Sequence, residues 1–505
     1  MGETMKKFLK RVVLGVAVAS LVAAGVSVGA TPLHAADDGQ VIVGAVIEPS
    51  SLDLTGAAGA EIPQLLLGNV YEGLLQISEQ GSIRPLLASQ YSVSEDGKTY
   101  TFYLKSARFH DGSRMTANDV VWSLRRLIDP TSPVTPDLKG QFDRIATIKS
   151  SGPSTVVVTL KTRDNDFEFN LTQRGGAIFK AGTSSFASTA NGTGPYKLKT
   201  WNRGTSVMLE RNERYHGTKA KTKTVVFRYI LDPTALSNAM LSGQIDIMTT
   251  VQSPELLDVF RQRKNLKVYS GSTTFEVTMG MNNSRAPLNN VKVRQAIRQA
   301  IDKRALVKTA WAGYGLRIGS FVPPTDPWYE NLANRYPYDL AKSRQLLAEA
   351  GYPNGFNLTL DVPGIPYATA SQEFIAASLA KVGIKVTIRP VSFPEWISRI
   401  FLQADYDMTI IAHVEPNDMA IYANPNYYFR FDNAQYRTLL TEAREAETKA
   451  ARNSAMRRAA RILSDQHVSD WLWLLPNIQV AKTNVSGFPV RAIGGGYVVA
   501  NIVKK

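Results

Sequence analysis

The sequence predicts an α/β fold divided into more than one lobe, and three observations support this. The chain has 505 residues, too many for one hydrophobic core, since domains usually hold about 100 to 200 residues. Helix and strand patterns alternate along its second half, as a layered α/β lobe requires. Internal repeats and low-complexity tracts are not evident. We therefore expect two or three globular units built around sheets.

The first expected segment is a secretory signal peptide over residues 1–35. A basic stretch from Lys6 to Arg11 precedes an apolar run over 12–28, and a cleavage-like site ends at Ala35. The alternative, a transmembrane anchor, is disfavoured because the run is short and rich in Ala and Gly. No later run approaches the roughly 20 apolar residues that cross a bilayer.

The clearest local pattern lies over residues 85–127. The pair Asp96-Gly97 predicts a turn, because Gly tolerates a positive φ and Asp can bond its own backbone. Residues 100–104 alternate apolar and polar side chains, which predicts a half-buried strand. Thr116 is placed to cap a helix, with Asp119 three residues on completing the cap.

Further strand and helix patterns frame the rest of the chain. A strand is expected over 41–47. In the second half, Asp339 can cap a helix that ends at Gly351. Another helix over 370–382 is followed by an alternating strand over 384–391.

Several short sequence motifs follow one another in a characteristic order along the chain. They are YEGL at 71–74, the segment 85–127, GTGPY at 192–196, RNERY at 211–215, VRQAI at 293–297, AID at 300–302 and LLAEAGY at 346–352. As an ordered set they resemble the bacterial extracytoplasmic solute-binding proteins of the oligopeptide and dipeptide type, family 5. Members of that family are the periplasmic receptors of ABC importers.

The resemblance implies a two-lobed periplasmic-binding-protein fold (type II, Venus-flytrap) of the α/β class, with an additional small inserted domain. Lobe I would comprise 37–78, 186–281 and 475–505, the inserted domain 79–185, and lobe II 282–474. The chain would cross between the lobes near 279–283 and near Pro476, and the two crossings would form a hinge. The ligand is then expected in the cleft between the lobes.

Composition limits where the protein works and what it binds. The chain has no Cys, so we expect neither a disulfide framework nor a lipidated cysteine, and a freely diffusing periplasmic protein rather than a lipoprotein. The formal charge is +15, but Lys and Arg are scattered rather than clustered, so nucleic acid is not an expected partner.

Motifs for catalysis and for metal binding are missing. The sequence has no G-x-S-x-G, GxxxxGK[ST] or HExxH motif and no nucleophilic Cys, so we expect no enzyme. A secreted hydrolase is the alternative from another class. Beyond the signal peptide the histidines are His110, His216, His413 and His467, and none is paired at ligand spacing. We therefore expect no metal and no cofactor, and we expect His110 and His216 to be surface or capping residues.

The segment 405–432 departs most from the family pattern. In peptide-binding members this region resembles Trp-Ala-Asp-Tyr-Pro-Asp-Pro, whose first Asp grips the ammonium group of the ligand. Glu415 stands near that position here, and Asp418 is a competing candidate. Since a buried ammonium needs a paired anion, either carboxylate would suit a cationic ligand end. We include His413 and Asn417 from the same stretch among the candidate ligand-binding residues.

Four further residues complete the candidate site. Tyr422 belongs to an aromatic, amide-rich stretch that suits sugar-like or opine-like ligands as well as peptides. The resemblance places Trp396 in the cleft, and Glu61 could contribute from the other lobe. Phe275 is expected to flank the cleft at the crossing, where an extended ligand could add to a strand edge.

The expected function is capture of a short peptide or peptide-like solute, which is passed to the permease subunits of an ABC importer. A monomer is expected. Within the receptor class, the alternative ligand is an oligosaccharide or an opine-like conjugate. Ligand contacts to both lobes would shift an open form to a closed form that the permease recognises.

Overall fold

The structure is a computed structural model that describes residues 39–57, 59–78, 80–414 and 416–505. The predicted signal peptide over 1–35 and the candidate residue Glu415 lie outside these residues. Among the described helices, none combines the length and the apolar character needed to span a bilayer.

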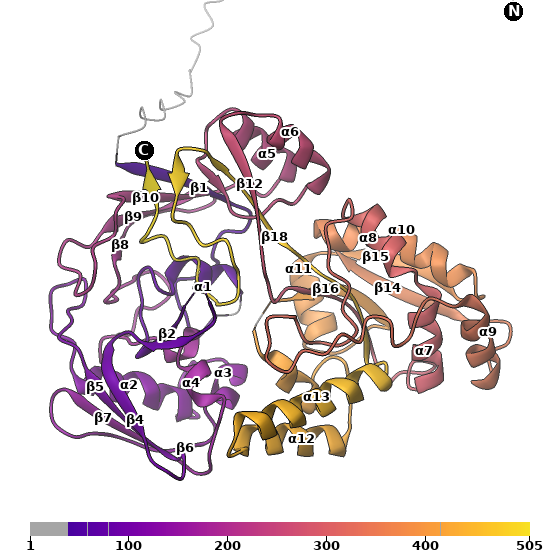
Figure 1. The fold of residues 1–505 in the computed structure, drawn as a ribbon, viewed down its shortest axis with the longest axis horizontal. Helices are drawn as coiled ribbons and strands as arrows, with labels where there is room; N and C mark the ends of the chain where they lie inside the picture. Colours follow the sequence, from indigo (N-terminus) through magenta and orange to yellow (C-terminus); the bar gives the residue numbers. More distant parts are fainter. Residues whose placement is uncertain (1–38, 58, 79, 415) are drawn as a thin grey trace, which may run out of the picture. The chain divides into compact units, whose positions relative to one another are not determined.

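The largest sheet has seven strands and combines segments from both ends of the chain (Figure 1). In spatial order they are β12 (Leu266–Gly271), β18 (Asn477–Lys482), β11 (Ile247–Met248), β1 (Gln40–Ala45), β10 (Thr224–Tyr229), β9 (Ser206–Arg211) and β8 (Tyr196–Asn202). β1 runs parallel to β10 and β11, whereas β18 is antiparallel to β11 and β12. The strand expected over 41–47 is therefore confirmed as a central strand.

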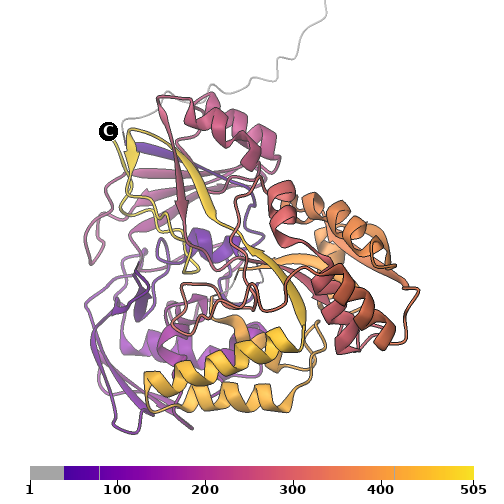
Figure 2. The ribbon, with the colours of Figure 1, turned by 45° about the vertical axis from the view of Figure 1, so that its right-hand side comes forward.

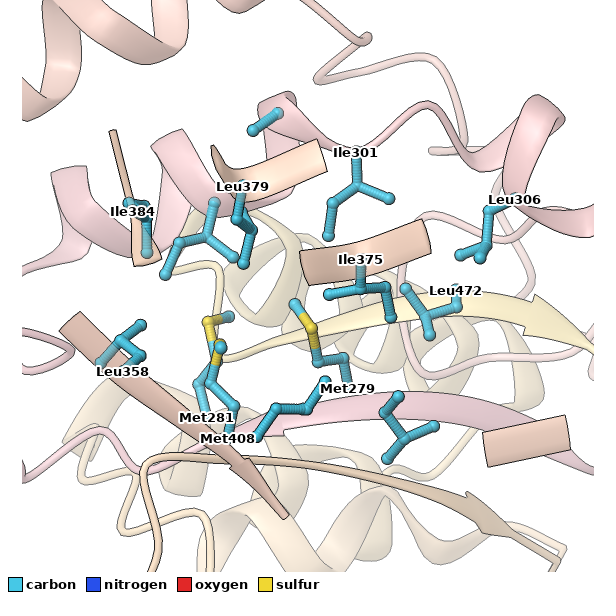
Figure 3. Packing of buried hydrophobic residues seen from close by; sticks show 14 of the residues in the cluster. Met279, Met281, Ile301, Leu306, Leu358, Ile375, Leu379, Ile384, Met408 and Leu472 are labelled. Carbon is cyan, nitrogen blue, oxygen red and sulfur yellow. The ribbon is translucent and has the colours of Figure 1, made fainter. Parts of the chain in front are cut away.

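A second sheet has five strands. In spatial order they are β15 (Lys385–Val391), β14 (Asn357–Pro363), β16 (Met408–His413), β13 (Glu276–Met281) and β17 (Ser469–Leu474). α10 (Pro366–Ala380) packs on β14 and β15. Figure 3 shows Met279 of β13 pointing toward Ile375 of α10 within a fully buried apolar cluster. Such a cluster is the main stabilising element of an α/β layer.

A third, four-stranded antiparallel sheet consists of β4 (Ala88–Val93), β5 (Thr99–Leu104), β7 (Thr155–Leu160) and β6 (Ile145–Ser150). α2 (Ala117–Ile128) packs against β6 and β7. At its N-terminus, the Thr116 backbone N–H and hydroxyl donate to Oδ2 of Asp119 at 2.8 and 2.9 Å. The capping box and the strand expected over 100–104 are both confirmed.

The remaining elements are short hairpins and connecting helices. The two-stranded pairs are β2 (Leu75–Ile77) with β3 (Ile83–Pro85) and β19 (Val485–Ser486) with β20 (Val503–Lys504). The helices in the first half are α1 (Glu61–Leu66), α3 (Pro136–Gln141), α4 (Phe167–Asn170), η1 (Arg174–Gly176), α5 (Pro233–Leu241), η2 (Pro254–Leu256) and α6 (Leu257–Arg261). Those that follow are α7 (Val291–Ala300), α8 (Lys303–Ala310), α9 (Leu340–Glu349), α11 (Phe393–Glu395), η3 (Trp396–Phe401), η4 (Asp418–Ala423), α12 (Ala434–Glu445) and α13 (Lys449–Asp465).

The helix expected after Asp339 is α9, and its predicted cap is confirmed. The Asp339 Oδ1 accepts from the backbone N–H of Lys342 at 2.9 Å, which satisfies one of the free donors of the first turn. The helix and strand expected over 370–382 and 384–391 correspond to α10 and β15.

Two connections carry the chain from the seven-stranded to the five-stranded sheet. One runs between β12 and β13 over 272–275, and the other joins β17 to β18 at Leu475 and Pro476. The crossing expected near Pro476 is confirmed. The crossing expected near 279–283 is wrong, because residues 276–281 already pair with β16 and β17 in the five-stranded sheet. The lobe and inserted-domain boundaries themselves stay a prediction.

Three of the family-like strings meet around the buried carboxylate of Glu72. Its Oε1 accepts from the Tyr215 hydroxyl at 2.6 Å, and its Oε2 accepts from the Thr193 hydroxyl at 2.8 Å. His216 Nε2 lies 2.9 Å from the same Oε2. The strings at 71–74, 192–196 and 211–215 thus share one polar centre, which explains why they occur together.

The two glycines of GTGPY, Gly192 and Gly194, are required because the main chain of residues 69–70 passes close to them. A Cβ on Gly192 would overlap the carbonyl oxygen of Val70, and one on Gly194 would overlap that of Asn69. His110 Nε2 lies 3.0 Å from the Gly194 carbonyl oxygen. The expectation that His110 and His216 are surface or capping residues is therefore wrong, because both make tertiary hydrogen bonds instead.

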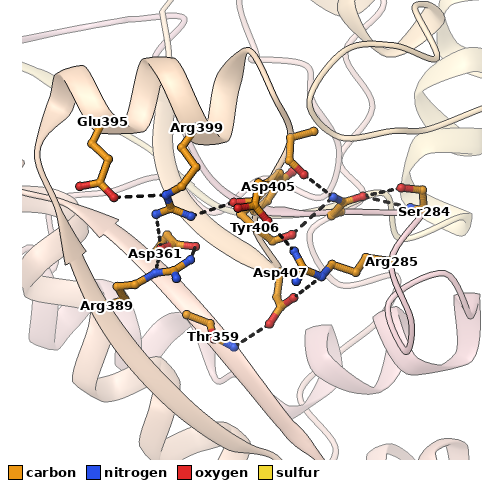
Figure 4. A network of polar contacts seen from close by, with 12 residues as sticks. Ser284, Arg285, Thr359, Asp361, Arg389, Glu395, Arg399, Asp405, Tyr406 and Asp407 are labelled. Carbon is orange, nitrogen blue, oxygen red and sulfur yellow. Dashed lines mark hydrogen bonds and ion pairs between the residues drawn. The ribbon is translucent and has the colours of Figure 1, made fainter.

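A polar network fixes the outer part of the five-stranded sheet (Figure 4). Asp361 of β14 is fully buried and accepts from Arg389 of β15 at 2.5 and 2.9 Å and from Arg399 of η3 at 2.8 Å. Arg399 also donates to the Asp405 carbonyl at 2.8 Å. Since a buried carboxylate is stable only when it is paired, this network holds η3 in place on the sheet.

Ion pairs join the segment 143–166 to α12 and α13, which lie side by side in both ribbon views (Figures 1 and 2). Arg444 contacts Asp164 at 2.5 Å, and Arg452 contacts Asp166 at 2.5 Å. Between them, the Asn165 backbone N–H donates to the Arg444 carbonyl at 2.8 Å. We call this set of contacts the latch, because it links the segment predicted as the inserted domain to the segment predicted as lobe II.

Candidate functional site

A small cavity of about 80 Å³ lies beside both sheet-to-sheet connections. Glu61 of α1 and Phe275 line it, as do Val414 and Pro416 on either side of Glu415. The main chain of 494–496 completes one wall. Two of the predicted site residues, Glu61 and Phe275, are therefore brought together from distant parts of the chain.

A larger cavity of about 890 Å³ lies beside the same two connections. Residues 270–273 and 474–476 line it, together with 314–316, 324–325 and Arg491. Arg491 lines the small cavity as well. The two connections are therefore flanked by hollows, which is where a hinge-type receptor places its ligand.

Three acidic residues influence one another through their charges, and each follows a cavity-lining residue by one or two positions in the chain; we call Glu276, Asp326 and Asp418 the acid trio. Glu276 is 2% exposed, and its Oε2 has no hydrogen-bond partner among the described residues. Burial, and then the negative charges of Asp418 and Asp326, raise the pKa of Glu276 well above its ordinary value. Burial and the charge of Asp418 raise the pKa of Asp326 to about 7.

Asp418 is held next to His413 in the turn that follows β16. Burial raises the pKa of Asp418, whereas His413 lowers it. The His413 side chain is 10% exposed and the Asp418 side chain 15%, and His413 Nδ1 lies 3.7 Å from the Asp418 Oδ2. The preceding residue, Asn417, has a φ of 61°, a conformation that Asn tolerates better than most residues. This turn directs the chain from the β-strand into η4 at the edge of the site.

Aromatic rings pack around His413, the neighbour of Asp418. His413 Nε2 lies 2.9 Å from the Tyr428 hydroxyl, and the His413 ring packs edge-on against Phe321. Tyr422 is 1% exposed, stacks on Phe429 at 4.7 Å and receives a hydrogen bond from Trp471 Nε1 at 3.2 Å. Tyr422 therefore packs behind the site, and direct ligand contact by it stays a prediction.

Trp396 lies away from both cavities. It is 4% exposed, its Nε1 donates to the Thr409 hydroxyl at 3.0 Å, and its ring stacks on Phe393 at 5.9 Å. Neither cavity has Trp396 in its lining. Its expected role as a cleft residue stays a prediction, as do the ligand contacts of Glu415, Asn417, His413 and Asp418.

The sequence analysis did not single out Glu276 and Asp326. Glu276 had a detectable signal, because it is the one charged residue in the strand Glu276–Met281, whose residues are all buried. Asp326 lies in an irregular, Pro-containing stretch, and no sequence pattern marked it as a site residue. The trio does not have the arrangement of a metal site, since no group of three or more His, Cys, Asp or Glu within the described residues could hold a metal ion.

Replacing Glu276 by Gln is expected to stabilise the ligand-free protein at pH 8 by about 1–4 kcal/mol, since a buried charge without a partner is costly. The pKa of Glu276 is raised in the folded state, so the cost of ionising it begins above pH ~4.5 and grows toward the folded-state pKa. Calorimetric melting at pH 4.5 and pH 8 checks this. The difference between variant and parent should be near zero at pH 4.5, and Glu255→Gln, at an exposed position, should show none at either pH. Equal melting temperatures at pH 8 would contradict the burial argument.

Comparison with known proteins identifies the family. Residues 82–435 match the bacterial extracellular solute-binding proteins, family 5 Middle. The glutathione-binding protein GsiB of Escherichia coli (strain K12) is 30% identical over 340 residues, which cover 66% of this chain and 65% of GsiB. The match thus spans slightly less than two thirds of that relative.

Solved structures agree with the fold. The ABC transporter-associated periplasmic binding protein DppA from Helicobacter pylori, in complex with the peptide STSA, has a TM-score of 0.84 and 24% identity, covering 92% of this chain and 98% of DppA. AgaA from A. tumefaciens R10, in complex with agropinic acid, has a TM-score of 0.82 and 25% identity, covering 92% and 99%. The predicted periplasmic-binding-protein fold is confirmed. Since the family match covers well over half of the sequence, the chain belongs to the bacterial extracellular solute-binding proteins, family 5.

Proposed function

We propose that the protein is the substrate-binding component of an ABC importer and that it captures a short peptide or peptide-like solute with a free ammonium group. Membership of a family of solute-binding proteins supports the receptor class, and it agrees with the expectation that the chain catalyses no reaction. The captured solute is then delivered to the permease subunits.

The acid trio is the observation that carries the ligand assignment. The Asp418 side chain is 15% exposed, and its negative charge raises the pKa of both Glu276 and Asp326. A group of acids where water is scarce favours a cationic ligand group, because a buried carboxylate is stable only when it is paired. Glu61 adds a carboxyl group to the lining of the small cavity.

Main-chain groups near the cavities suit the rest of a peptide. Residues 494–496 are all Gly and line the small cavity, so their backbone is accessible to a ligand. Phe275 lines the same cavity directly before β13. An extended peptide can bond such main-chain groups whatever its side chains are.

An opine-like ligand is the second candidate. AgaA was solved in complex with agropinic acid and is 25% identical to this chain. The aromatic surroundings of His413, with Phe321 and Tyr428 in contact, suit a sugar-derived ligand too. An oligosaccharide shares the aromatic preference but has no cationic group for the acid trio.

The proposed mechanism is closure around the hinge. Contacts from Glu61 on one side and Asp418 on the other would favour a closed form, which the permease recognises. The protein would act in the periplasm as a monomer. Binding in the micromolar range corresponds to about 8 kcal/mol, which one charge pair and several main-chain bonds can supply.

Calorimetric titration with a small panel tests the proposal. The panel comprises Ala-Ala-Ala, Lys-Ala-Ala, glutathione and agropinic acid, together with N-acetyl-Ala-Ala-Ala. Saturable binding of at least one free-amine peptide, with no binding of the acetylated form, is expected. Tighter binding of agropinic acid than of every peptide would favour the opine reading, and hydrolysis of any panel member would overturn the receptor assignment.

Replacing Asp418 by Asn is expected to weaken binding of free-amine peptides by about 10- to 100-fold, the effect of losing one charged hydrogen bond. Titration of parent and variant with Lys-Ala-Ala measures this. Asp432→Asn is the matched control, because Asp432 is 70% exposed and its ion pair among the described residues is with Arg437 at the surface. An unchanged affinity in Asp418→Asn would remove Asp418 from the site.

A further inference from the structure

One residue, Arg491, lines both of the cavities beside the sheet-to-sheet connections. It is exposed, so its guanidinium is accessible to a solute. Among the described lining residues of the two cavities, the charged side chains are those of Arg491 and Glu61, and Glu61 lines only the small cavity. The two cavities thus offer one positive group that they share and one negative group in the smaller of them.

The main chain that carries Arg491 is fixed to both connections. The Ala492 backbone N–H donates to the carbonyl of Ser272, in the connection before β13, at 2.9 Å. On the other side, Nδ2 of Asn477, the first residue after the second connection, donates to the Val490 carbonyl at 2.7 Å. A main chain held on both sides gives its side chain a defined origin, as a preorganised binding group requires.

The guanidinium of Arg491 has the chemistry to bind a carboxylate. Its planar N–H donors match the two oxygens of a carboxylate, and such charged pairs are stronger than neutral hydrogen bonds. A peptide-like solute carries a carboxylate at its C-terminal end. With its ammonium end in the small cavity, where Glu61 lies, such a solute reaches the larger cavity past Arg491.

The larger cavity provides room and an apolar wall. Its volume of about 890 Å³ lies within the range of about 300–1,000 Å³ that is usual for ligand pockets, whereas the small cavity of about 80 Å³ admits only a small group. Leu316 lines the larger cavity and is 50% exposed, although its backbone pairs with Leu474. The other apolar lining residues include Pro324, Leu474, Leu475, Pro476, Phe488 and Val490. An apolar side chain of a solute would cover this wall and remove it from water.

We propose that Arg491 binds the carboxylate of the captured solute and that the larger cavity takes the side chain next to that carboxylate. The receptor therefore selects short zwitterionic solutes whose carboxylate-bearing residue is large and apolar. This inference rests on the proposed function and deepens it, because it names the chemistry of the second end of the ligand. A solute whose carboxylate is amidated, or whose last side chain is small, loses one of the two contributions.

Calorimetric titration with Lys-Ala-Phe, as the free acid and as the C-terminal amide, tests the role of Arg491. The parent should bind the acid about 10- to 100-fold more tightly than the amide, the effect of one charged hydrogen bond. Arg491→Gln should bind both forms with similar affinity, close to that of the parent for the amide. Arg263→Gln is the matched control and should keep the full preference for the acid, because Arg263 is exposed and lines neither cavity.

Comparison of Lys-Ala-Phe with Lys-Ala-Ala, both as free acids, tests the role of the larger cavity. The parent should bind the Phe peptide at least about tenfold more tightly, the usual gain from burying a large apolar side chain. Leu316→Asn should reduce this preference several-fold and should keep the preference for the acid over the amide. Because Leu316 is half exposed, the replacement removes an apolar contact for the solute without opening a gap in the core.

The outcomes separate this inference from the proposed function. If the parent binds acid and amide equally, or if Arg491→Gln keeps the full preference for the acid, the role of Arg491 is wrong and the receptor assignment stands. If the parent does not prefer the Phe peptide, or if Leu316→Asn leaves that preference unchanged, the larger cavity does not take the side chain. If the parent binds no member of the peptide panel, the proposed function fails as well. Binding of the amide by Arg491→Gln distinguishes loss of the carboxylate contact from misfolding.

Discussion

Replacing Glu72 by Ala is expected to lower the free energy of unfolding by about 3–5 kcal/mol, the usual cost of removing one partner from a buried charged cluster. Glu72 accepts from Thr193 and Tyr215, and it faces His216 at 2.9 Å. Without the carboxylate, these polar groups from three chain segments lose their common partner, and each unsatisfied buried group costs about 1–3 kcal/mol.

Urea denaturation of the purified protein measures the effect, and Glu213→Ala is the matched control. Glu213 belongs to the string at 211–215, which also provides Tyr215, but it is 55% exposed and pairs with Arg211 and Lys219 at the surface. Its replacement should change stability by less than about 0.5 kcal/mol. Equal losses in the two variants would mean that Glu72 is not the centre that joins the strings.

Replacing Arg444 by Ala is expected to release the latch and to speed ligand dissociation. Arg444 contacts Asp164, whose side chain is 1% exposed, and truncating one partner of such a pair costs about 2–5 kcal/mol. If the latch forms only on closure, this loss destabilises the closed form relative to the open form. Since 1.4 kcal/mol corresponds to a factor of ten, the population ratio of closed to open form should fall at least about tenfold.

Two measurements check the latch. Small-angle scattering of the ligand-saturated protein should give a larger radius of gyration for Arg444→Ala than for the parent, and stopped-flow release of Lys-Ala-Ala should be faster. Arg437→Ala is the control from the same helix, because within the described part of the chain Arg437 forms its ion pair with the exposed Asp432. If the radius of gyration and the release rate are both unchanged, the latch is a fixed part of the fold. The segment 79–185 and lobe II would then not move relative to each other on ligand binding.

Local signals in the sequence predicted much of the fold. Thr116 with Asp119, and Asp339 before α9, are caps whose chemistry is complete within a few residues, so no tertiary contact is needed to recognise them. The crossing placed near 279–283 was wrong because residues 276–281 are buried without a turn signal, and only strand pairing shows to which sheet they belong. His110 and His216 were misjudged for the same reason, since their partners are distant in the chain.

The candidate site was predictable in part. Glu61 and Phe275, both candidates from the sequence, line one cavity, and Val414 and Pro416 line it as well. The importance of Glu276 depends on which charges surround it, and Asp326 and Asp418 lie far from it in sequence. A carboxyl inside an otherwise apolar strand is nevertheless a signal, because such a residue costs stability wherever the strand is buried.

Native mass spectrometry of protein purified from the periplasm without denaturation tests the receptor assignment most directly. The account predicts a one-to-one complex with a co-purified species of peptide mass. A co-purified species of carbohydrate mass, or turnover of any bound peptide during the measurement, would contradict it.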